Sequence, residues 1–156
     1  MSLVPADPPA CAEAVEAVAE ADWVVLGPGS WFTSVLPHLL VPELASALIA
    51  TQARRLVTLN LAPQPGETEG FSPHAHLEVL ARHAPDLAFD VVLADRTAVT
   101  SSVAKETTHE LEEAAAKLGG RLVLADLAMA GRPDRHDPRR LAGAFAQVFE
   151  AELLGE

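Results

Sequence analysis

The sequence predicts an α/β fold, with a doubly wound, mostly parallel sheet of about four strands and flanking helices. Three observations predict it. Strand-like and helix-like segments alternate along the chain, which favours parallel strands joined by crossover helices. The strand-like segments are apolar throughout, as in a sheet covered on both faces. A length of 156 residues suits one hydrophobic core, so residues 1–156 are expected to form a single domain.

The expected elements of the first half alternate regularly. Residues 11–21 are rich in alanine and carry valines spaced for one helix face. Residues 23–26 (WVVL) are too few and too apolar for a helix and indicate a buried strand. Residues 31–51 have a helical pattern that two prolines interrupt, and residues 54–60 (RRLVTLN) predict a second strand. Residues 61–71 are polar, hold two prolines and two glycines, and predict a loop.

The second half continues the same alternation. Ser72-Pro73 begins a helix, with the serine as N-cap and the proline in the first turn. Residues 89–94 predict a third strand, and residues 121–127 (RLVLADL) a fourth. Between them, residues 107–120 begin with a capping box and end with two glycines, as a helix does. Asp137-Pro138 begins a last helix by the same cap-and-proline device.

Composition and charge exclude several classes of partner. The net charge is −11, from 11 basic and 22 acidic residues, and this balance argues against a nucleic-acid partner. No apolar run approaches the roughly 20 residues that cross a bilayer, so no membrane span is expected. The N-terminus lacks the features of a signal peptide, and a cytoplasmic location is expected. Cys11 is the only cysteine, so a disulfide framework within the chain is excluded.

The first candidate site is the glycine turn after the first strand. Gly27 and Gly29 allow positive φ and a close ligand approach, and Pro28 lies between them. Ser30 is placed to cap the following helix, where free N–H groups can hold an anion, and Thr33 adds a hydroxyl. The motif is neither a Walker loop nor a dinucleotide fingerprint. Two interpretations therefore stay open, a tight corner and a seat for phosphate or carboxylate.

The loop after the second strand is the second candidate. A loop of this length between short elements is more often functional than idle, although a solvated crossover remains an alternative. Its donors, acceptors and turn-forming glycine are Asn60, Gln64, Gly66, Glu67 and Thr68. Ligands bind beyond the carboxyl ends of strands in such sheets. That rule places residues 27–33, 60–71, 95–108 and 126–137 on one edge.

Two long motifs resemble a known family. Residues 27–44 (GPGSWFTSVLPHLLVPEL) and residues 59–80 (LNLAPQPGETEGFSPHAHLEVL) resemble the YvcK-type proteins, often called gluconeogenesis factors, of the CofD superfamily. Residues 135–138 (RHDP) resemble the family's segment before its last helix. The Trp31-Phe32 and Ala62-Pro63 pairs look like an actinobacterial variant of these motifs.

The resemblance implies a Rossmann-like, CofD-like fold that binds a UDP-sugar, either UDP-N-acetylglucosamine or UDP-glucose. It implies a regulatory role in carbon metabolism, cell-wall synthesis and cell shape, without catalysis of its own and with no required cofactor. Arg135 is implied as a ligand contact, and its guanidinium suits a diphosphate. The tyrosine that the family places at the nucleotide has no counterpart here, because the chain contains no tyrosine.

A second departure concerns the N-terminus. Family members begin with a glycine-rich strand, turn and helix that bind phosphate, and no such segment occurs here. The chain is therefore expected to be the C-terminal portion of a longer CofD-like chain, with part of the ligand site outside it. A homodimer is left open.

The alternative function is that of the sister enzymes, the 2-phospho-L-lactate transferases of deazaflavin cofactor biosynthesis. That reaction would need Mg²⁺, and Glu67, Asp95 and Asp126 are the carboxylates available on the predicted edge. Carboxylates in such places more often order a loop or face solvent. The glycine turn and the Gln-Pro-Gly-Glu-Thr loop are typical of the regulator branch rather than of the transferases.

The histidines do not complete a metal site or a catalytic group. His74 and His76 are two residues apart and do not share a helix face, whereas His76 and His83 do. No cysteine or carboxylate completes a ligand set with them, so no metal site is expected. No Ser-His-Asp arrangement can be identified, and the catalytic residues, if there are any, are unknown.

Overall fold

The computed structural model describes residues 2–100 and 108–154, and four parallel strands form its main sheet. The strands are β1 (Trp23–Leu26), β2 (Arg54–Thr58), β3 (Val91–Asp95) and β4 (Arg121–Ala125). They lie side by side in the order β1-β2-β3-β4, and each neighbouring pair is parallel. The predicted mostly parallel α/β sheet of four strands is therefore confirmed. Among these strands the spatial order follows the sequence without a reversal.

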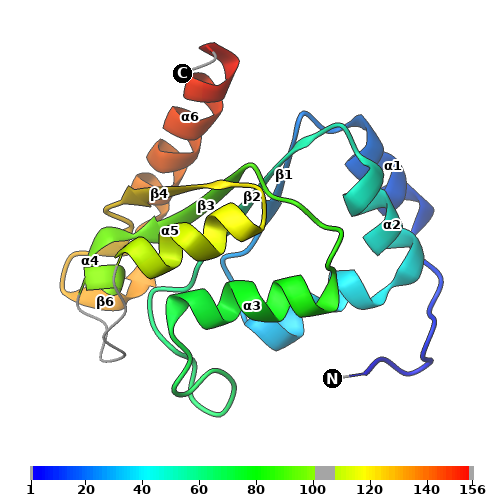
Figure 1. Ribbon diagram of the computed structural model, residues 1–156, viewed down its shortest axis with the longest axis horizontal. Helices are drawn as coiled ribbons and strands as arrows, with labels where there is room; N and C mark the ends of the chain where they lie inside the picture. The colour runs from blue at the N-terminus through cyan, green and yellow to red at the C-terminus, as the bar shows by residue number, and fades with distance from the viewer. Residues whose placement is uncertain (1, 101–107, 155–156) are drawn as a thin grey trace.

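Helices surround this sheet (Figure 1). They are α1 (Ala12–Glu20), α2 (Pro42–Ala50), α3 (Pro73–His83), α4 (Arg96–Thr100), α5 (Thr108–Lys117) and α6 (Pro138–Leu154). Figure 1 shows α3 and α5 in front of the sheet, whereas α6 runs behind β4 and extends past it. The sheet is thus covered on both faces, as its continuous apolar strands predict.

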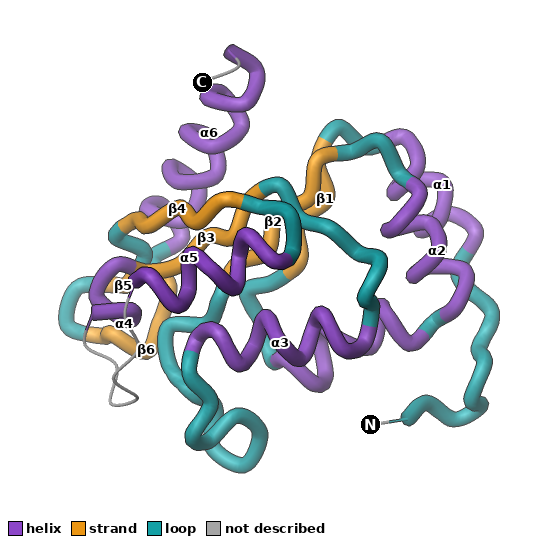
Figure 2. The backbone as a smooth tube through the Cα atoms, viewed as in Figure 1, coloured by secondary structure: helices purple, strands orange, loops and turns teal. Residues whose placement is uncertain are grey.

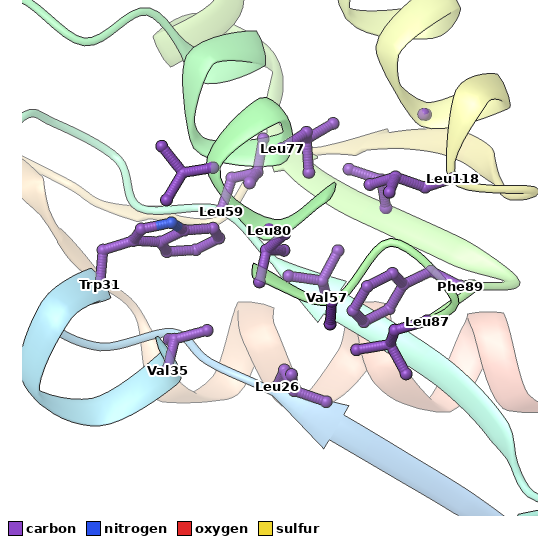
Figure 3. Packing of buried hydrophobic residues seen from close by; sticks show 14 of the residues in the cluster. Leu26, Trp31, Val35, Val57, Leu59, Leu77, Leu80, Leu87, Phe89 and Leu118 are labelled. Atoms are coloured by element: carbon purple, nitrogen blue, oxygen red, sulfur yellow. The ribbon is translucent and has the colours of Figure 1, made fainter. Parts of the chain in front are cut away.

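The alternation of side chains along the central strands explains this arrangement. Val57 of β2 and Val92 of β3 pack with Leu77 and Leu80 of α3 and with Leu111 of α5 in one core. Part of this core is drawn in Figure 3, where Val57 lies beneath Leu80 and beside Phe89. Each buried leucine or valine stabilises the fold by about 1.5–3 kcal/mol.

The adjacent residues of the same strands form a second core. Leu56 of β2 and Leu93 of β3 pack with Leu127 and with Ala144 and Val148 of α6. Because successive side chains in a strand point to opposite faces, one strand supplies both cores.

The register brings the strand ends to one edge. Leu26 pairs with Val57, Thr58 with Leu93, and Asp95 with Ala125. The segments that follow the four strands therefore begin at the same edge of the sheet, as the sequence predicts.

Most predicted helix ends are confirmed. Ser72 caps α3 by accepting a hydrogen bond from the Ala75 N–H at 3.4 Å. Asp137 caps α6, because its Oδ1 accepts the N–H groups of Arg139 and Arg140. The capping box predicted at Thr107 lies outside the described residues.

Three segments differ from the sequence-based expectation. The interrupted helical region 31–51 is a π-helix η1 (Trp31–Val35), a 3₁₀-helix η2 (Leu36–Leu40) and then α2. Residues 95–108 contain α4, and residues 126–137 contain an antiparallel hairpin of β5 (Ala128–Met129) and β6 (Arg132–His136). A run such as RPDRH has no apolar alternation, so its strand could not be predicted from hydrophobic periodicity.

No single helix among the described residues is long and apolar enough to cross a membrane. Trp31–Leu40 and Pro42–Ala50 together have the required length and composition, but an 84° bend separates them. The apolar side chains of this pair include Trp31, Leu36 and Leu48, which are buried in the core.

Candidate functional site

The glycine turn lies against the end of β2. Gly27 has φ +76°, and a Cβ at this position would lie 2.8 Å from the carbonyl oxygen of Thr58. A side chain is therefore excluded both by backbone conformation and by contact. Gly29 lacks this left-handed conformation, but a Cβ on it would lie 3.2 Å from the Cβ of Ser34. The predicted special role of glycine thus rests on φ at Gly27 and on close packing at Gly29.

Gly29 and Asn60 join the two candidate segments by a reciprocal pair of hydrogen bonds. The Asn60 Nδ2 donates to the Gly29 carbonyl at 2.9 Å, and the Gly29 N–H donates to the Asn60 Oδ1 at 3.3 Å. Asn60 follows β2, so its side chain fixes the turn after the neighbouring strand. The sequence placed both residues on the same edge, and the structure brings them into contact.

Ser30 and Glu67 form a second link between the same segments. The Ser30 hydroxyl lies 2.9 Å and 2.7 Å from the two carboxylate oxygens of Glu67 and donates to them. Ser30 Oγ also accepts from the N–H and the hydroxyl of Thr33, which confirms the predicted N-cap. A carboxylate of the chain itself therefore lies at the start of η1.

The loop between β2 and α3, drawn in teal in Figure 2, also has hydrogen bonds between its own residues. The Gln64 N–H donates to the Thr68 hydroxyl at 2.8 Å, and the Gln64 carbonyl accepts the N–H groups of Glu67 and Thr68. Thr68 is fully buried, and Gly66 has φ +75°, as its predicted turn role requires. The loop is thus held in one conformation by its polar residues.

These contacts change the interpretation of the glycine turn as an anion seat. The sequence predicted free N–H groups at a helix start, but the Gly29 N–H is bonded to Asn60 and the Thr33 N–H to Ser30. The helix that follows is the five-residue η1 rather than a long α-helix. In this conformation the hydrogen bonds of the turn mainly join it to the loop after β2.

A polar pocket of about 250 Å³ lies beside these links. Its lining residues come from the glycine turn, the loop after β2 and strand β6, and they are Pro28, Gly29, Asn60, Leu61, Ala62, Gln64, Asp134 and His136. Sheet register and the hairpin bring these three segments together from positions about a hundred residues apart in sequence. Four of the predicted site residues, Pro28, Gly29, Asn60 and Gln64, line this pocket.

Two polar atoms of the pocket residues are buried and have no hydrogen-bond partner. They are the side-chain oxygen of Gln64 and the Nε2 of His136. An unsatisfied buried polar atom costs about 1–3 kcal/mol, so each such atom in a folded protein needs an explanation. Burial also lowers the pKa of His136, although the Asp95 charge and a hydrogen bond to the Leu59 backbone act in the opposite direction. His136 is therefore neutral at pH 7.

Asp95, at the end of β3, bonds the two segments that follow β3 and β4 at this edge of the sheet. Its Oδ1 accepts the N–H groups of Thr97 and Ala98, and its Oδ2 accepts those of Leu127 and Ala128 at 2.7 Å and 3.1 Å. Burial raises the pKa of Asp95, but these hydrogen bonds and that of the Thr97 hydroxyl outweigh it, and the pKa is lowered. Asp95 thereby positions α4 and the start of the hairpin.

Arg135, predicted as a ligand contact, is exposed on β6 and does not line the pocket. Its neighbours Asp134 and His136 do, because alternate residues of a strand share a face. The sequence-based interpretation missed these two residues by treating residues 126–137 as a loop. If these residues had been assigned to a strand, the alternation of side chains would have placed Asp134 and His136 on one face and Arg135 on the other.

The core beneath the turn contains an aromatic cluster that was also missed. Trp31 is fully buried and contacts the His76 ring edge-on, at 5.0 Å between centroids. Phe71 contacts both His76, at 5.5 Å, and Phe32, at 6.3 Å. Burial lowers the pKa of His76, and its bond to the Ser72 carbonyl opposes this only in part. The cluster joins η1, the loop end and α3 beneath the candidate site.

The candidate metal ligands do not converge in the described residues. No group of three or more His, Cys, Asp or Glu side chains is arranged there to hold a metal ion. Glu67 is bonded to Ser30, Asp95 to backbone N–H groups, and the exposed Asp126 lies 3.7 Å from Arg96. The rings of His76 and His83 each bond a carbonyl of their own helix region, at Ser72 and Val79. Each of these three carboxylates thus already has a partner among the described residues.

Comparison with known proteins identifies the family to which this chain belongs. A family model described as "2-phospho-L-lactate transferase CofD" matches residues 1–127. A Mycobacterium tuberculosis protein named "Putative gluconeogenesis factor" is 51% identical over 151 residues, covering 97% of this chain and 43% of its own length. A Listeria innocua "Gluconeogenesis factor" is 38% identical over 118 residues, covering 72% of this chain and 36% of its own length.

The fold is also shared with a solved structure. A UPF0052-family protein from Bacillus halodurans superposes with a TM-score of 0.75 at 30% sequence identity. The superposition covers 92% of this chain and 48% of that protein. This chain thus spans less than half the length of the relatives that it matches.

Proposed function

This chain belongs to the CofD family, and we propose that it is a nucleotide-sugar-binding regulatory protein of the gluconeogenesis-factor (YvcK) type. Its ligand would be a UDP-sugar, UDP-N-acetylglucosamine or UDP-glucose, and its role would lie in carbon metabolism, cell-wall synthesis and cell shape. The observation that carries this proposal is the polar pocket between the glycine turn, the loop after β2 and strand β6.

The position of the pocket supports binding of a small polar ligand. It lies at the carboxyl edge of a parallel sheet, where such folds bind ligands. Its walls combine backbone of the glycine turn with the side chains of Asn60, Gln64 and His136. The Gly29–Asn60 and Ser30–Glu67 links fix these walls before a ligand arrives, which lowers the entropic cost of binding.

A non-catalytic role is proposed because the acidic groups of the edge already have partners within the chain. A transferase needs carboxylates free to hold a metal ion, whereas both oxygens of Asp95 accept backbone N–H groups and Glu67 accepts from Ser30. The family model is nevertheless described by a transferase activity, so 2-phospho-L-lactate transfer is the second candidate. Metal-dependent turnover of a guanylyl-lactate donor would support that alternative.

Calorimetric titration of the folded chain with UDP-N-acetylglucosamine and UDP-glucose tests the proposal. We expect saturable binding that Asn60→Ala weakens at least tenfold, because this change releases the glycine turn from the loop. Gln52→Ala is the matched control, since this exposed residue precedes β2 at the opposite edge. A folded chain that binds neither UDP-sugar, or an Asn60→Ala variant that binds as the wild type does, would contradict the proposal.

A further inference from the structure

Beneath the glycine turn, one buried side chain anchors the short helix η1 to the core. Trp31, the first residue of η1, is fully buried, and its ring meets the ring of His76 on α3 edge-on, at 5.0 Å between centroids. Figure 3 shows this indole ring reaching from η1 towards the part of α3 that carries Leu77 and Leu80. A helix of five residues has little stability of its own. The position of η1, and of Ser30 directly before it, therefore depends on this contact.

The two rings hold unpartnered groups of opposite kinds. The His76 Nδ1 lies 3.0 Å from the Ser72 carbonyl oxygen, and because a carbonyl can only accept, Nδ1 carries the proton. Nε2 of the neutral ring is then an acceptor, and it is buried without a hydrogen-bond partner among the described residues. The indole N–H of Trp31, which can only donate, is buried without such a partner as well. The neutral ring pair thus combines one acceptor with one donor.

The surroundings of His76 suit a neutral ring. The residue is 6% exposed, and Phe71 also contacts its ring, at 5.5 Å between centroids. Three ionisable side chains on the neighbouring segments bond to other groups, and they are His38, Glu67 and His74. The others on α3 and in the loop are exposed, as are all those of α5, and the former are Glu69, Glu78, Arg82 and His83. A proton added at Nε2 therefore has no acceptor in the described part of the chain.

We propose that His76 is a pH-sensitive lock that holds η1, and with it the glycine turn, against α3. A proton at Nε2 turns the acceptor of the ring pair into a second donor and places a charge in an apolar cluster, which is costly without a partner. The protonated ring therefore leaves the cluster for water, and Trp31 loses its contact. Because Ser30 directly precedes Trp31, its bond to Glu67 loses its support. Mild acid thus releases the turn and the loop that form the pocket wall, whichever ligand the pocket holds.

The direction of the effect follows from the two states of His76. Burial lowers its pKa in the locked state, and the bond to the Ser72 carbonyl opposes this only in part. A released ring in water titrates near the ordinary value of 6.5, so the released state takes up the proton first as the pH falls. The ratio of released to locked molecules should therefore rise by up to about tenfold for each pH unit below 6.5, until the pH reaches the lowered pKa.

Native-state hydrogen exchange of the whole chain tests the lock. The amides of Ser34 and Val35, which both donate to the Ser30 carbonyl, report on η1, and the amides of β3 report on global unfolding. Protection factors are measured at about pH 7.5 and 5.5, with and without a low concentration of urea. Urea accelerates exchange through global unfolding but hardly affects a local opening, because a local opening exposes little surface.

We expect the protection of Ser34 and Val35 to fall severalfold, and by at most about tenfold, between these pH values without a response to urea. His76→Phe keeps a ring but cannot titrate, and it should remove this pH dependence; His76→Gln serves the same purpose if the phenylalanine variant does not fold. His83→Phe is the matched control and should behave as the wild type, because His83 bonds a carbonyl of α3 in the same way, at 2.9 Å, but is exposed. A urea response equal to that of β3, no pH dependence in the wild type, or a pH dependence that persists without His76 overturns the inference.

Discussion

The hydroxyl of Ser30 lies 2.7 Å from one carboxylate oxygen of Glu67 and 2.9 Å from the other. This contact joins the turn after β1 to the loop after β2, two segments that are 37 residues apart in the chain. The loop therefore depends on the turn for its position, and the pocket wall depends on both.

Removing the Glu67 carboxylate should release this loop. Glu67→Ala is expected to cost about 1 kcal/mol of unfolding free energy, since the contact is a charge-assisted bond that is only partly buried. It should also increase the rate of limited proteolysis within residues 61–71 severalfold. Glu69→Ala, at an exposed position of the same loop, is the control and should cleave as the wild type does. Equal rates for all three proteins would show that the Ser30–Glu67 contact does not hold the loop.

Gly27 should tolerate alanine much less well than Gly66 does. Both have φ near +75°, but only at Gly27 would a Cβ meet another atom, the Thr58 carbonyl oxygen at 2.8 Å. We expect Gly66→Ala to lower the unfolding free energy by about 1 kcal/mol, the cost of the left-handed conformation, and Gly27→Ala by about 3 kcal/mol. Urea denaturation of the two variants measures the difference. Similar losses would mean that the contact with β2 relaxes at little cost.

Asp95→Asn should be strongly destabilising. Its side-chain amide can accept through one oxygen only, so it leaves backbone N–H groups on one side of the carboxylate unpaired. A loss of about 3 kcal/mol is expected in urea denaturation. The exposed Asp126→Asn is the control and should change stability by less than about 0.5 kcal/mol. A small effect at Asp95 would show that the carboxylate does not hold the hairpin and α4.

The stability of the protein should fall on mild acidification because of His76 and His136. Burial lowers the pKa of both below the ordinary value of 6.5, so the unfolded chain takes up protons first as the pH falls. Their contribution is full above pH 6.5 and is lost as the pH falls towards their folded-state pKa values. Urea denaturation between pH 7.5 and 5 should show this slope, and His76→Phe should reduce it by at most one proton. A wild type without any slope would contradict the prediction.

Arg135→Ala should weaken UDP-N-acetylglucosamine binding severalfold, if the role implied by the family resemblance holds. Arg135 is exposed on β6 beside two pocket residues, and a guanidinium suits the bidentate binding of a diphosphate. Arg139→Ala is the matched control, because Arg139 is equally exposed but does not line the pocket. Calorimetry would remove the assignment if the two variants bound the ligand equally well.

Local signals in the sequence determined the sheet and most helix ends. The apolar runs at residues 23–26 and 54–58 identified β1 and β2, and Ser72-Pro73 marked the start of α3. These signals are local, because a buried strand must be apolar and a capping side chain bonds within three residues. The placing of Gly27–Ser30 and Asn60–Thr68 on one edge followed from parallel topology alone.

Only the tertiary structure decided which of these residues meet and what they leave free. The sequence could not show that Asn60 and Glu67 occupy the donors of the glycine turn, nor that Asp134 and His136 rather than Arg135 line the pocket. Such pairings join positions from 31 to about a hundred residues apart, and their geometry depends on strand register and on a hairpin without apolar alternation. Local patterns specify the elements, whereas the packing of the elements against one another specifies the site.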